Sequence, residues 1–230
     1  MSKRGIVVAL AGNPNSGKTT VFNNLTGARQ HVGNWPGVTV EKKEGKCPAG
    51  GCEIHVVDLP GVYSLTAYSP DEIVARNFIV EEKPDVVVDV VDASNLERNL
   101  YLAVQLMEIG APLVVALNMM DQAEAREHRV DVAALSRELG VPVVPMIASQ
   151  GRGTDELRDA IVAVADGAMV SKGAKLEYGR EVEKEIAKLE EELKGMNLGG
   201  AYSARWVAIK LLEGDEEVER QLMEVANVRK

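Results

Sequence analysis

The sequence has 230 residues, of which 46% are hydrophobic and 4% aromatic, and its formal net charge is −9. This length suits one sizeable domain with a smaller appendage. The acidic balance, without any basic run, argues against a nucleic-acid-binding surface. No apolar run approaches the roughly 18 residues that a transmembrane helix needs, and a strand begins too soon after Met1 for a signal peptide. We therefore expect a soluble chain.

A phosphate-binding loop follows the first apolar run, residues 6–10. From residue 12 to residue 19 the chain reads G-N-P-N-S-G-K-T, which matches the pattern G-x-x-x-x-G-K-T, and a helical pattern follows. Between a strand and a helix, the backbone N–H groups of such a loop wrap a phosphate chain, while Lys18 reaches the terminal phosphates and the Thr19 hydroxyl binds Mg²⁺. The motif therefore predicts binding of a nucleoside triphosphate. The residues assigned to this contact are Gly12, Asn13, Pro14, Asn15, Ser16, Gly17, Lys18, Thr19 and Thr20.

A second motif, Asn118-Met119-Met120-Asp121, indicates which base is bound. It follows the apolar run 113–117, so it lies at the carboxyl end of a strand, where doubly wound sheets bind ligands. An aspartate there suits guanine, because its carboxylate accepts hydrogen bonds from N1–H and from the exocyclic amine. Adenine would leave that carboxylate unpaired, at a cost of several kcal/mol. The alternative, that Asp121 only caps the next helix, is weakened by the phosphate loop.

Two further motifs are expected to surround the γ-phosphate. Asp58 ends the run 53–57, and Gly61 follows; this arrangement places a carboxylate behind the Mg²⁺ water shell and a glycine amide at the γ-phosphate. Thr39 lies in a Gly/Pro/Asn-rich loop that is able to move, where its hydroxyl would add a second Mg²⁺ ligand in the triphosphate state. Gly37 and Val38 are assigned to the same nucleotide contact. The predicted catalytic residues are Asn15, Lys18, Thr39 and Gly61.

A fifth element completes the set. Ala148 and Ser149 follow the strand at 143–146, and their backbone is placed to touch the guanine edge. Five elements in this order indicate a Ras-like P-loop GTPase that binds GTP or GDP with Mg²⁺. The fold class is α/β, with a mostly parallel six-stranded sheet, helices on both faces and an antiparallel second strand at the edge. The six strands are expected near Ile6, Val38, Ile54, Val86, Val114 and Val143.

The pattern divides the chain into a GTP-binding domain, residues 1–168, and a small all-α subdomain, residues 172–230. In the first part, Ser69 to Glu72 form a capping box, and helices are expected near 96–108, 132–139 and 155–165. In the second part, three amphipathic helices are expected, two of them capped by Ser203 and Asp215. Cys47 and Cys52 flank a turn between strands. A reduced hairpin tip is favoured there over a disulfide or half of a metal site.

The combined motifs resemble a narrower family. Residues 12–20, 22–23, 25–27 and 30–41 are similar to the cytoplasmic G domain of the FeoB family, which are ferrous-iron transporters of bacteria and archaea with an N-terminal GTPase. The specific part is V-G-N-W-P-G-V-T-V-E at 32–41, and the resemblance covers about residues 6–166. It implies a domain at the cytoplasmic face of the cell membrane that regulates or powers iron uptake through a permease domain. It also implies no nucleic-acid partner, a helical domain that favours GDP retention, and homo-oligomers, if any, formed through the membrane domain.

Departures from the Ras-like pattern shape the expected mechanism. Val62 stands where Ras-like enzymes carry the glutamine that orients the attacking water, so slow intrinsic hydrolysis is expected. Met119 replaces a common lysine, and its methylenes and sulfur would still cover the guanine face. No arginine finger is evident in the phosphate loop or the mobile loop. A monovalent cation fits that place if oxygen ligands come from the Asn15 side chain and from the Gly33 and Trp35 carbonyls. The FeoB resemblance implies that this cation is K⁺.

Two other function classes remain open from the sequence. A GTPase of ribosome assembly or tRNA modification shares the Asn-rich phosphate loop, but Val40-Glu41 and the acidic helical tail argue against it. A nucleotide-controlled scaffold that does not hydrolyse GTP is kept open by Val62. Measuring GTP turnover with and without K⁺ would distinguish a scaffold from a GTPase. An RNA pull-down would distinguish an RNA-linked GTPase from a transporter GTPase.

Overall fold

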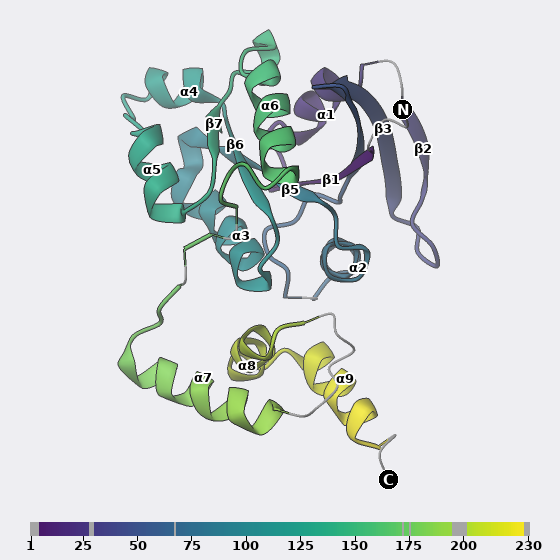
Figure 1. Cartoon of the computed structure of the whole chain (residues 1–230), viewed down its shortest axis with the longest axis vertical. Coiled ribbons are helices and arrows are strands. Elements are labelled where there is room, and N and C mark those ends of the chain that lie inside the picture. The colour runs from purple at the N-terminus through teal and green to yellow at the C-terminus, as the bar shows by residue number, and fades with distance from the viewer. Residues whose placement is uncertain are drawn as a thin grey trace. The chain divides into compact units, whose positions relative to one another are not determined.

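The structure is a computed structural model that describes residues 5–27, 30–66, 68–171, 173–174, 176–194 and 202–227. It divides into two compact units, Met1–Ala174 and Lys175–Lys230. The first unit is an α/β layer structure and the second is helical (Figure 1). No helix within the described ranges has both the length and the apolar character to cross a membrane.

The first unit is built around one sheet, which has seven strands among the described residues, in the order β2-β3-β4-β1-β5-β6-β7. Strands β4, β1, β5, β6 and β7 are parallel, whereas β2 and β3 run antiparallel at one edge. Strands β5 and β6 are mostly apolar and almost entirely buried, as expected for strands covered on both faces. The strands are β1 (Gly5–Gly12), β2 (Gln30–Asn34), β3 (Glu41–Ala49), β4 (Cys52–Asp58), β5 (Val86–Asp92), β6 (Leu113–Asn118) and β7 (Val143–Pro145).

The observed edge of the sheet differs from the predicted one. A six-stranded sheet with a strand near Val38 was expected, but Val38 lies in a bend between β2 and β3. The strand after the mobile loop is antiparallel as predicted, yet β2 lies outside it as the true edge, paired through Val32 and Lys43. The sequence conceals β2 because all five of its residues are exposed, so the strand shows no alternation of apolar and polar residues.

Helices cover both faces of the sheet (Figure 1). On one face, α1 and α6 enclose the main apolar core, in which Phe22, Leu157 and Ile161 pack against alternate residues of β1, β4 and β5. On the other face, α3 packs against β5 and β6. The helices and helical turns of this unit are α1 (Lys18–Thr26), α2 (Pro70–Asn77), the π-helix η1 (Phe78–Glu82), the 3₁₀ turn η2 (Ala93–Asn95), α3 (Leu96–Ile109), α4 (Met120–Ala125), α5 (Val132–Leu139), the 3₁₀ turn η3 (Ala148–Gln150) and α6 (Thr154–Ala165).

Most of these helices were predicted from capping residues and hydrophobic periodicity in the sequence. The capping box is confirmed: the Glu72 N–H donates to Ser69 Oγ (3.2 Å), the Ser69 N–H donates to Glu72 Oε2 (3.2 Å), and α2 begins at Pro70. Helix α4 was not predicted, because its six residues give too short a pattern. Cys47 and Cys52 lie on the β3–β4 hairpin, as expected for residues that flank a turn between strands.

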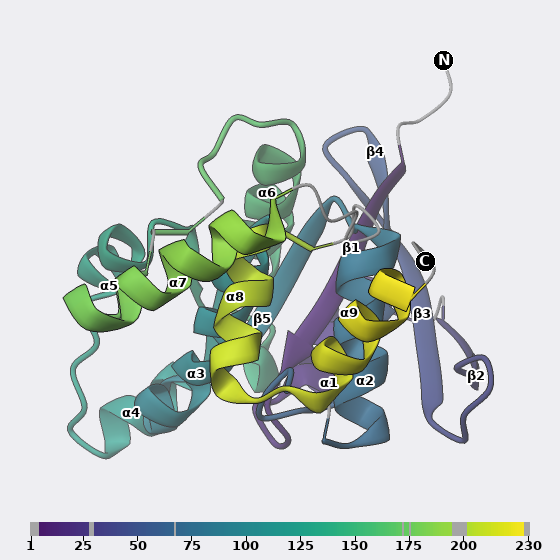
Figure 2. The same cartoon turned by 90° about the horizontal axis from the view of Figure 1, so that it is seen from below.

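The second unit consists, in its described residues, of α7 (Arg180–Leu193), α8 (Ala204–Glu213) and α9 (Glu216–Asn227), as Figure 2 shows. The predicted caps are confirmed, since the Trp206 N–H donates to Ser203 Oγ (3.2 Å) and the Val218 N–H donates to Asp215 Oδ1 (3.1 Å). Helices α7 and α8 pack against each other, and Ile186 and Trp206 on these helices are fully buried. The predicted helical subdomain is therefore present.

One buried carboxyl predicts how stability varies with pH. Asp89 on β5 is 1% exposed, and its Oδ2 has no hydrogen-bond partner among the described residues. Burial raises its pKa to about 7. A carboxyl with a raised pKa in the folded state contributes stability that is complete below its unfolded pKa, near 4, and is lost as pH rises through 7. We expect Asp89→Asn to be more stable than the wild type at pH 8 by several kcal/mol, with a much flatter pH dependence in urea unfolding. Parallel pH profiles for the two proteins would contradict this.

Candidate nucleotide site

The phosphate loop between β1 and α1 has the geometry of an anion cradle. Gly17, in the left-handed region at φ 87°, precedes the first residue of α1, and no side chain caps the N–H groups of that helix. A Cβ at Gly17 would overlap Asn118 Nδ2, and a Cβ at Gly12 would lie 2.8 Å from the Val90 carbonyl oxygen. Only glycine fits at these two positions, because any side chain would collide with Asn118 or with β5.

Unsatisfied polar atoms line the same loop. The Asn13 amide and the Ser16 hydroxyl are buried, and neither has a hydrogen-bond partner among the described residues. Buried polar groups are normally hydrogen-bonded, so such atoms mark a site that takes a polar ligand. Together with the free N–H groups of α1, they fit the phosphates of a nucleotide.

Lys18 links this loop to the end of β4. Its Nζ forms an ion pair with Asp58 and donates to the Leu59 carbonyl oxygen (2.6 Å). Asp58 is 7% exposed; burial raises the pKa of its carboxyl, and the Lys18 ammonium opposes that rise. A cation and a carboxylate thus meet beside Thr19, the first-turn residue of α1 that was predicted to bind Mg²⁺. This donor set of a hydroxyl and a carboxylate is one that Mg²⁺ accepts, directly or through water.

Asn118, at the end of β6, joins two loops. Its Nδ2 donates to the Ser16 carbonyl oxygen (2.9 Å), and its Oδ1 accepts from the Ala148 N–H (2.9 Å). The side chain is 3% exposed, so both hydrogen bonds are shielded from water. The asparagine of the N-x-x-D motif therefore fixes the phosphate loop and the Ala148 loop relative to each other, a structural role that the sequence did not show.

The remaining base-binding candidates lie close to Asn118 in the chain. Met119 has φ 60° and precedes α4, and Asp121 lies half-buried in the first turn of that helix. Ser149 is exposed in η3, next to the buried Ala148. The structure thus places the N-x-x-D motif and the Ala148 loop at the carboxyl end of the sheet, together with the phosphate loop.

Asn24 was missed by the sequence analysis. Its Nδ2 donates to the Ala148 carbonyl oxygen (2.8 Å), and its own carbonyl oxygen accepts from Arg158 Nη2 (2.9 Å). The Ala148 peptide is therefore held on both sides, by Asn118 at its N–H and by Asn24 at its carbonyl. No motif could have identified Asn24, because the two hydrogen-bonded residues are 124 positions apart.

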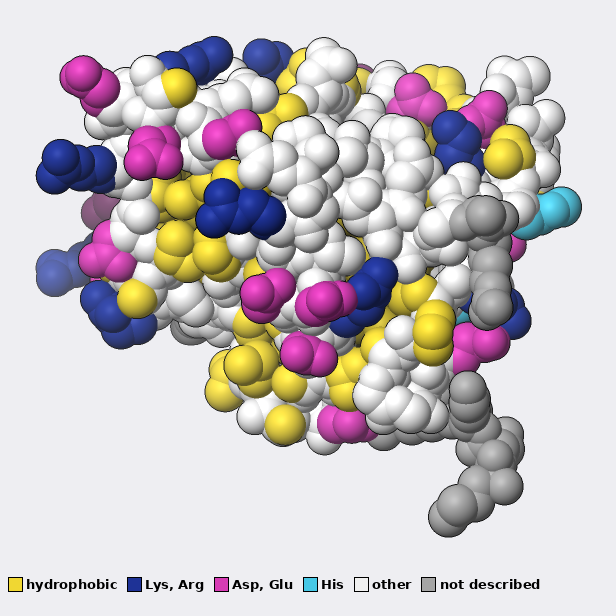
Figure 3. Space-filling model, turned by 90° about the horizontal axis from the view of Figure 1, so that it is seen from above, with side chains coloured by type: hydrophobic (Ala, Val, Ile, Leu, Met, Phe, Trp, Pro, Cys, Tyr) yellow, Lys and Arg dark blue, Asp and Glu magenta, His cyan; other side chains and the backbone are white. Residues whose placement is uncertain are grey.

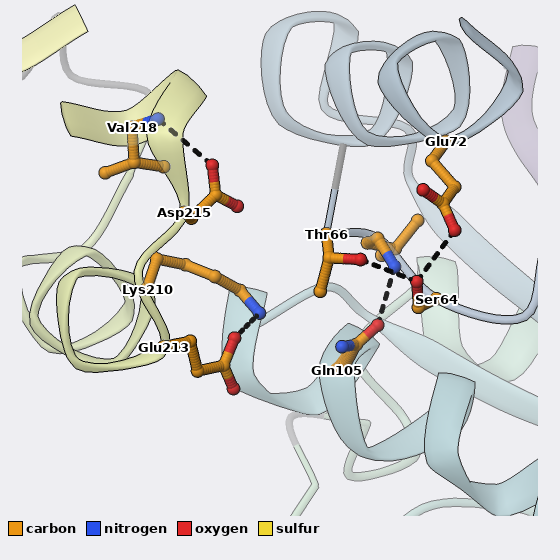
Figure 4. Close-up of polar contacts among 9 residues, drawn as sticks. Ser64, Thr66, Glu72, Gln105, Lys210, Glu213, Asp215 and Val218 are labelled. Carbon is orange, nitrogen blue, oxygen red and sulfur yellow. Dashed lines mark hydrogen bonds and ion pairs between the residues drawn. The ribbon is translucent and has the colours of Figure 1, made fainter. Parts of the chain in front are cut away.

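The segment from Leu59 to Leu65, which contains Gly61, is held by hydrogen bonds at both of its ends. The Leu59 N–H donates to the Leu10 carbonyl oxygen (3.0 Å) and the Val62 N–H to the Gly12 carbonyl oxygen (3.3 Å). Further along, Ser64 Oγ donates to Glu72 Oε1 (2.8 Å), and the Leu65 N–H donates to Gln105 Oε1 (2.6 Å), as Figure 4 shows. Glu72 and Gln105 were also not identified as site residues from the sequence.

Among the described residues, no hydrogen bond joins the mobile loop to the phosphate loop. Thr39 is exposed, and Trp35 and Val38 line a groove of about 650 Å³ against β3, β4 and α2. The Trp35 ring is 8% exposed, meets Phe78 edge-on (5.4 Å between ring centroids) and lies 4.8 Å from Lys42 Nζ. In this conformation the predicted ligands of this loop are exposed or turned toward the groove. They are Gly33, Trp35, Gly37, Val38 and Thr39.

Family models match nearly the whole chain. The model described as ferrous iron transport protein B matches residues 6–161, and the model of the FeoB cytosolic helical domain matches residues 178–230. A Porphyromonas gingivalis Fe(2+) transport protein A/Fe(2+) transporter FeoB fusion protein is 46% identical over 94% of this chain and 26% of its own length. The Escherichia coli Fe(2+) transporter FeoB is 45% identical over 91% of this chain and 27% of its own length. The chain thus spans about a quarter of the length of these relatives.

Solved structures agree with this similarity. The cytosolic domain of the T. maritima FeoB iron transporter in a GDP form has a TM-score of 0.91 at 40% identity, covering 96% of this chain and 87% of that one. The same domain in a GMPPNP form has a TM-score of 0.89 at 40% identity, covering 96% and 86%. An S. thermophilus NFeoB E67A mutant bound to GDP has a TM-score of 0.86 at 43% identity, covering 94% and 82%.

Proposed function

Since the chain belongs to the FeoB family, we propose that it is the Mg²⁺-dependent GTP-binding and GTP-hydrolysing part of a ferrous-iron transporter, with a helical subdomain after it. The observation that carries this proposal is the meeting of three motifs at one end of the sheet: the phosphate loop, Asp58 and Asn118. The GDP and GMPPNP forms of the T. maritima cytosolic domain support guanine nucleotide as the ligand.

Phosphate binding follows from the open N-terminus of α1. The loop's N–H groups and the Lys18 ammonium hold the β- and γ-phosphates, and Lys18 exchanges its contact with Asp58 for a phosphate oxygen. Thr19 and, through water, Asp58 would hold Mg²⁺, and the bound ion would supply positive charge against the charge that develops between the β- and γ-phosphates. The Gly61 N–H then faces the γ-phosphate, because its loop is fixed to Gly12 through Val62.

Guanine recognition is assigned to the residues next to Asn118. The Asp121 carboxylate accepts from the base N1–H and amino groups, Met119 covers one face of the ring, and the Ala148–Ser149 backbone contacts its edge. Asn118 and Asn24 contribute by holding the Ala148 peptide in place. The Ala148 peptide is thus held at its N–H and at its carbonyl, which favours a defined fit for one base.

The mobile loop is proposed to switch between two positions. In the position described here, Trp35 is buried against Phe78 and Lys42, and Thr39 faces solvent. For Thr39 to join Mg²⁺ in the triphosphate state, the loop must move toward the phosphates and draw Trp35 out of its groove.

Tryptophan fluorescence is expected to report this movement. The chain has two tryptophans, so Trp206→Phe leaves Trp35 as the reporter. We expect red-shifted Trp35 emission with the analogue GMPPNP relative to GDP, because the indole ring exchanges Phe78 for water. Emission spectra of the variant in the two nucleotides measure this. Identical spectra would mean that the switch is placed wrongly.

Two alternative functions make different predictions. On the face of the molecule in Figure 3, Lys and Arg side chains are interspersed with Asp and Glu rather than gathered into one basic patch, which favours the transporter over an RNA-linked GTPase. Val62 has no group to orient water, so we propose that the intrinsic rate of GTP hydrolysis is slow. A scaffold that does not hydrolyse GTP would instead show no phosphate release at all.

The proposed coupling places this chain at the cytoplasmic face of the membrane, acting on a permease domain of the same transporter. Any homo-oligomer would form through that membrane domain. The test is a chimera in which this chain replaces the matching quarter of the E. coli relative, in cells without other ferrous-iron transport. We expect ⁵⁵Fe²⁺ uptake with the wild-type chain and its loss with Lys18→Ala at equal protein level. Equal uptake by the two chimeras, or none with the wild-type chain present in the membrane, would contradict the proposal.

A further inference from the structure

The loop that follows Gly61 lacks the side chain that orients the attacking water in Ras-like enzymes. Those enzymes carry a glutamine at this position, whereas residue 62 of this chain is a valine that is 4% exposed. The groups that Gly61 and Val62 can offer to the γ-phosphate or to a water molecule are therefore backbone amides. A backbone amide is only as well placed as the anchors of its loop, so those anchors take over the positioning that a side chain would otherwise supply.

The first anchor is the phosphate loop itself. Val62 donates its N–H to the Gly12 carbonyl oxygen (3.3 Å), and a Cβ built at Gly61 would lie 3.5 Å from Pro14 Cα. Gly61 therefore rests against the loop that is proposed to hold the phosphates. The hydrogen bond from Val62 is long, so it cannot alone determine where the following residues lie.

The second anchor comes from the middle of α3, a helix that carries none of the nucleotide motifs. Gln105 is 2% exposed, and its Oε1 accepts from the N–H of Leu65, which is 1% exposed, at 2.6 Å. In Figure 4 this side chain points from α3 directly at the loop between Ser64 and Thr66. A short hydrogen bond shielded from water is strong, and the buried Leu65 N–H would be left unsatisfied without it.

The orientation of the amide is determined by this contact. If Oε1 and Nε2 were exchanged, two donors would face each other at Leu65, so the carbonyl end must point to the loop. Gln105 Nε2 is then buried without a partner among the described residues. A leucine would avoid that cost, and the half-satisfied amide therefore indicates that its acceptor serves the loop rather than the stability of the core.

We propose that Gln105 is a positioning residue for GTP hydrolysis: through the Leu65 N–H it holds the segment after Gly61 against the phosphate loop. This rests on the proposed GTPase function. Gln105 does not touch nucleotide or water; it acts through the backbone between Gly61 and Leu65. The outer side of the loop is held separately by Glu72, which accepts from Ser64 Oγ (2.8 Å) and the Tyr68 N–H (2.9 Å), so the loop keeps part of its structure when Gln105 is changed.

The test replaces Gln105 with leucine, which has similar volume and no acceptor. We expect kcat for GTP to fall about tenfold, as for the loss of a buried hydrogen bond, while KM and GDP affinity stay within about twofold. Asn99→Leu is the matched control: Asn99 is a buried amide on the same helix, and its Oδ1 accepts from the Asp92 N–H (3.2 Å) rather than from a residue of this loop. This control should lose stability and keep its kcat.

A second variant separates positioning from packing. Gln105→Glu keeps the acceptor and the shape, so its kcat should lie close to that of the wild type. An unchanged kcat in Gln105→Leu, an equal fall in Asn99→Leu, or an equal fall in Gln105→Glu would each overturn the proposal. A wild-type chain without turnover would instead overturn the GTPase function on which the proposal rests.

Discussion

Replacing Asp121 with asparagine is expected to weaken GTP binding by about a hundredfold or more. The carboxylate is proposed to accept two hydrogen bonds from guanine, and a bidentate charged contact is worth roughly 3 kcal/mol. An amide in its place offers a donor to the base N1–H and amino groups, which are themselves donors. The same variant should gain affinity for xanthosine triphosphate, whose 2-oxo group accepts the new donor. Titration with fluorescent nucleotide analogues measures both changes.

A matched control for this variant is Asp131→Asn. Asp131 is also at the start of a helix, since it caps α5 through its Oδ1, which accepts from the Ala134 N–H (2.9 Å), but it is outside the N-x-x-D motif. This control should bind GTP as the wild type does. Unchanged GTP affinity in Asp121→Asn, or an equal loss in Asp131→Asn, would mean that Asp121 is only a helix-start residue.

Turnover is expected to be faster in KCl than in NaCl at equal ionic strength, and Asn15→Ala should remove that difference. An arginine finger contributes roughly 10³–10⁵ in rate, so a cation in its place should stimulate by about tenfold or more. Asn15 is exposed on the phosphate loop, where its side-chain oxygen is free to take part in an all-oxygen shell with the Gly33 and Trp35 carbonyls once the mobile loop closes. GDP binding should be nearly unchanged in the variant, because other loop residues hold the phosphates.

The backbone at this position calls for a second variant. Asn15 has φ 67°, a left-handed conformation that asparagine tolerates and alanine does not. Asn15→Gly removes the side-chain oxygen without that strain, so it should also lose K⁺ stimulation. Phosphate release in the two salts tests both variants. Equal wild-type rates in KCl and NaCl, or retained stimulation in Asn15→Gly, would contradict this role.

The parts of the site that were predicted from sequence are those determined by local backbone geometry. The phosphate loop was located because Gly12, Gly17 and Lys18 must occupy fixed positions between a strand and a helix, and the structure shows that a Cβ at either glycine would collide with its surroundings. The capping box at Ser69 was predictable for the same reason, since all its partners lie within three residues.

What the sequence did not show depends on contacts between distant segments. Asn24 and Gln105 are ordinary helix residues until folding brings Ala148 and Leu65 beside them, 124 and 40 positions away along the chain. Strand β2 was missed because it is paired on one side only and exposed on both faces, so no hydrophobic pattern marks it. The strand expected near Val38 begins only at Glu41, because Val38 lies in a bend and lines the groove beside Trp35.

The most direct test of the account is GTP turnover by the purified chain with Mg²⁺ and KCl, compared with Lys18→Ala. Lys18 is the residue whose ammonium links the phosphate loop to Asp58 and is proposed to bind the terminal phosphates. We predict slow release of GDP and phosphate in equal amounts by the wild type, and release at the buffer rate by Lys18→Ala. A wild-type rate equal to that of the variant, with GTP bound and intact, would contradict hydrolysis and leave a nucleotide-controlled scaffold.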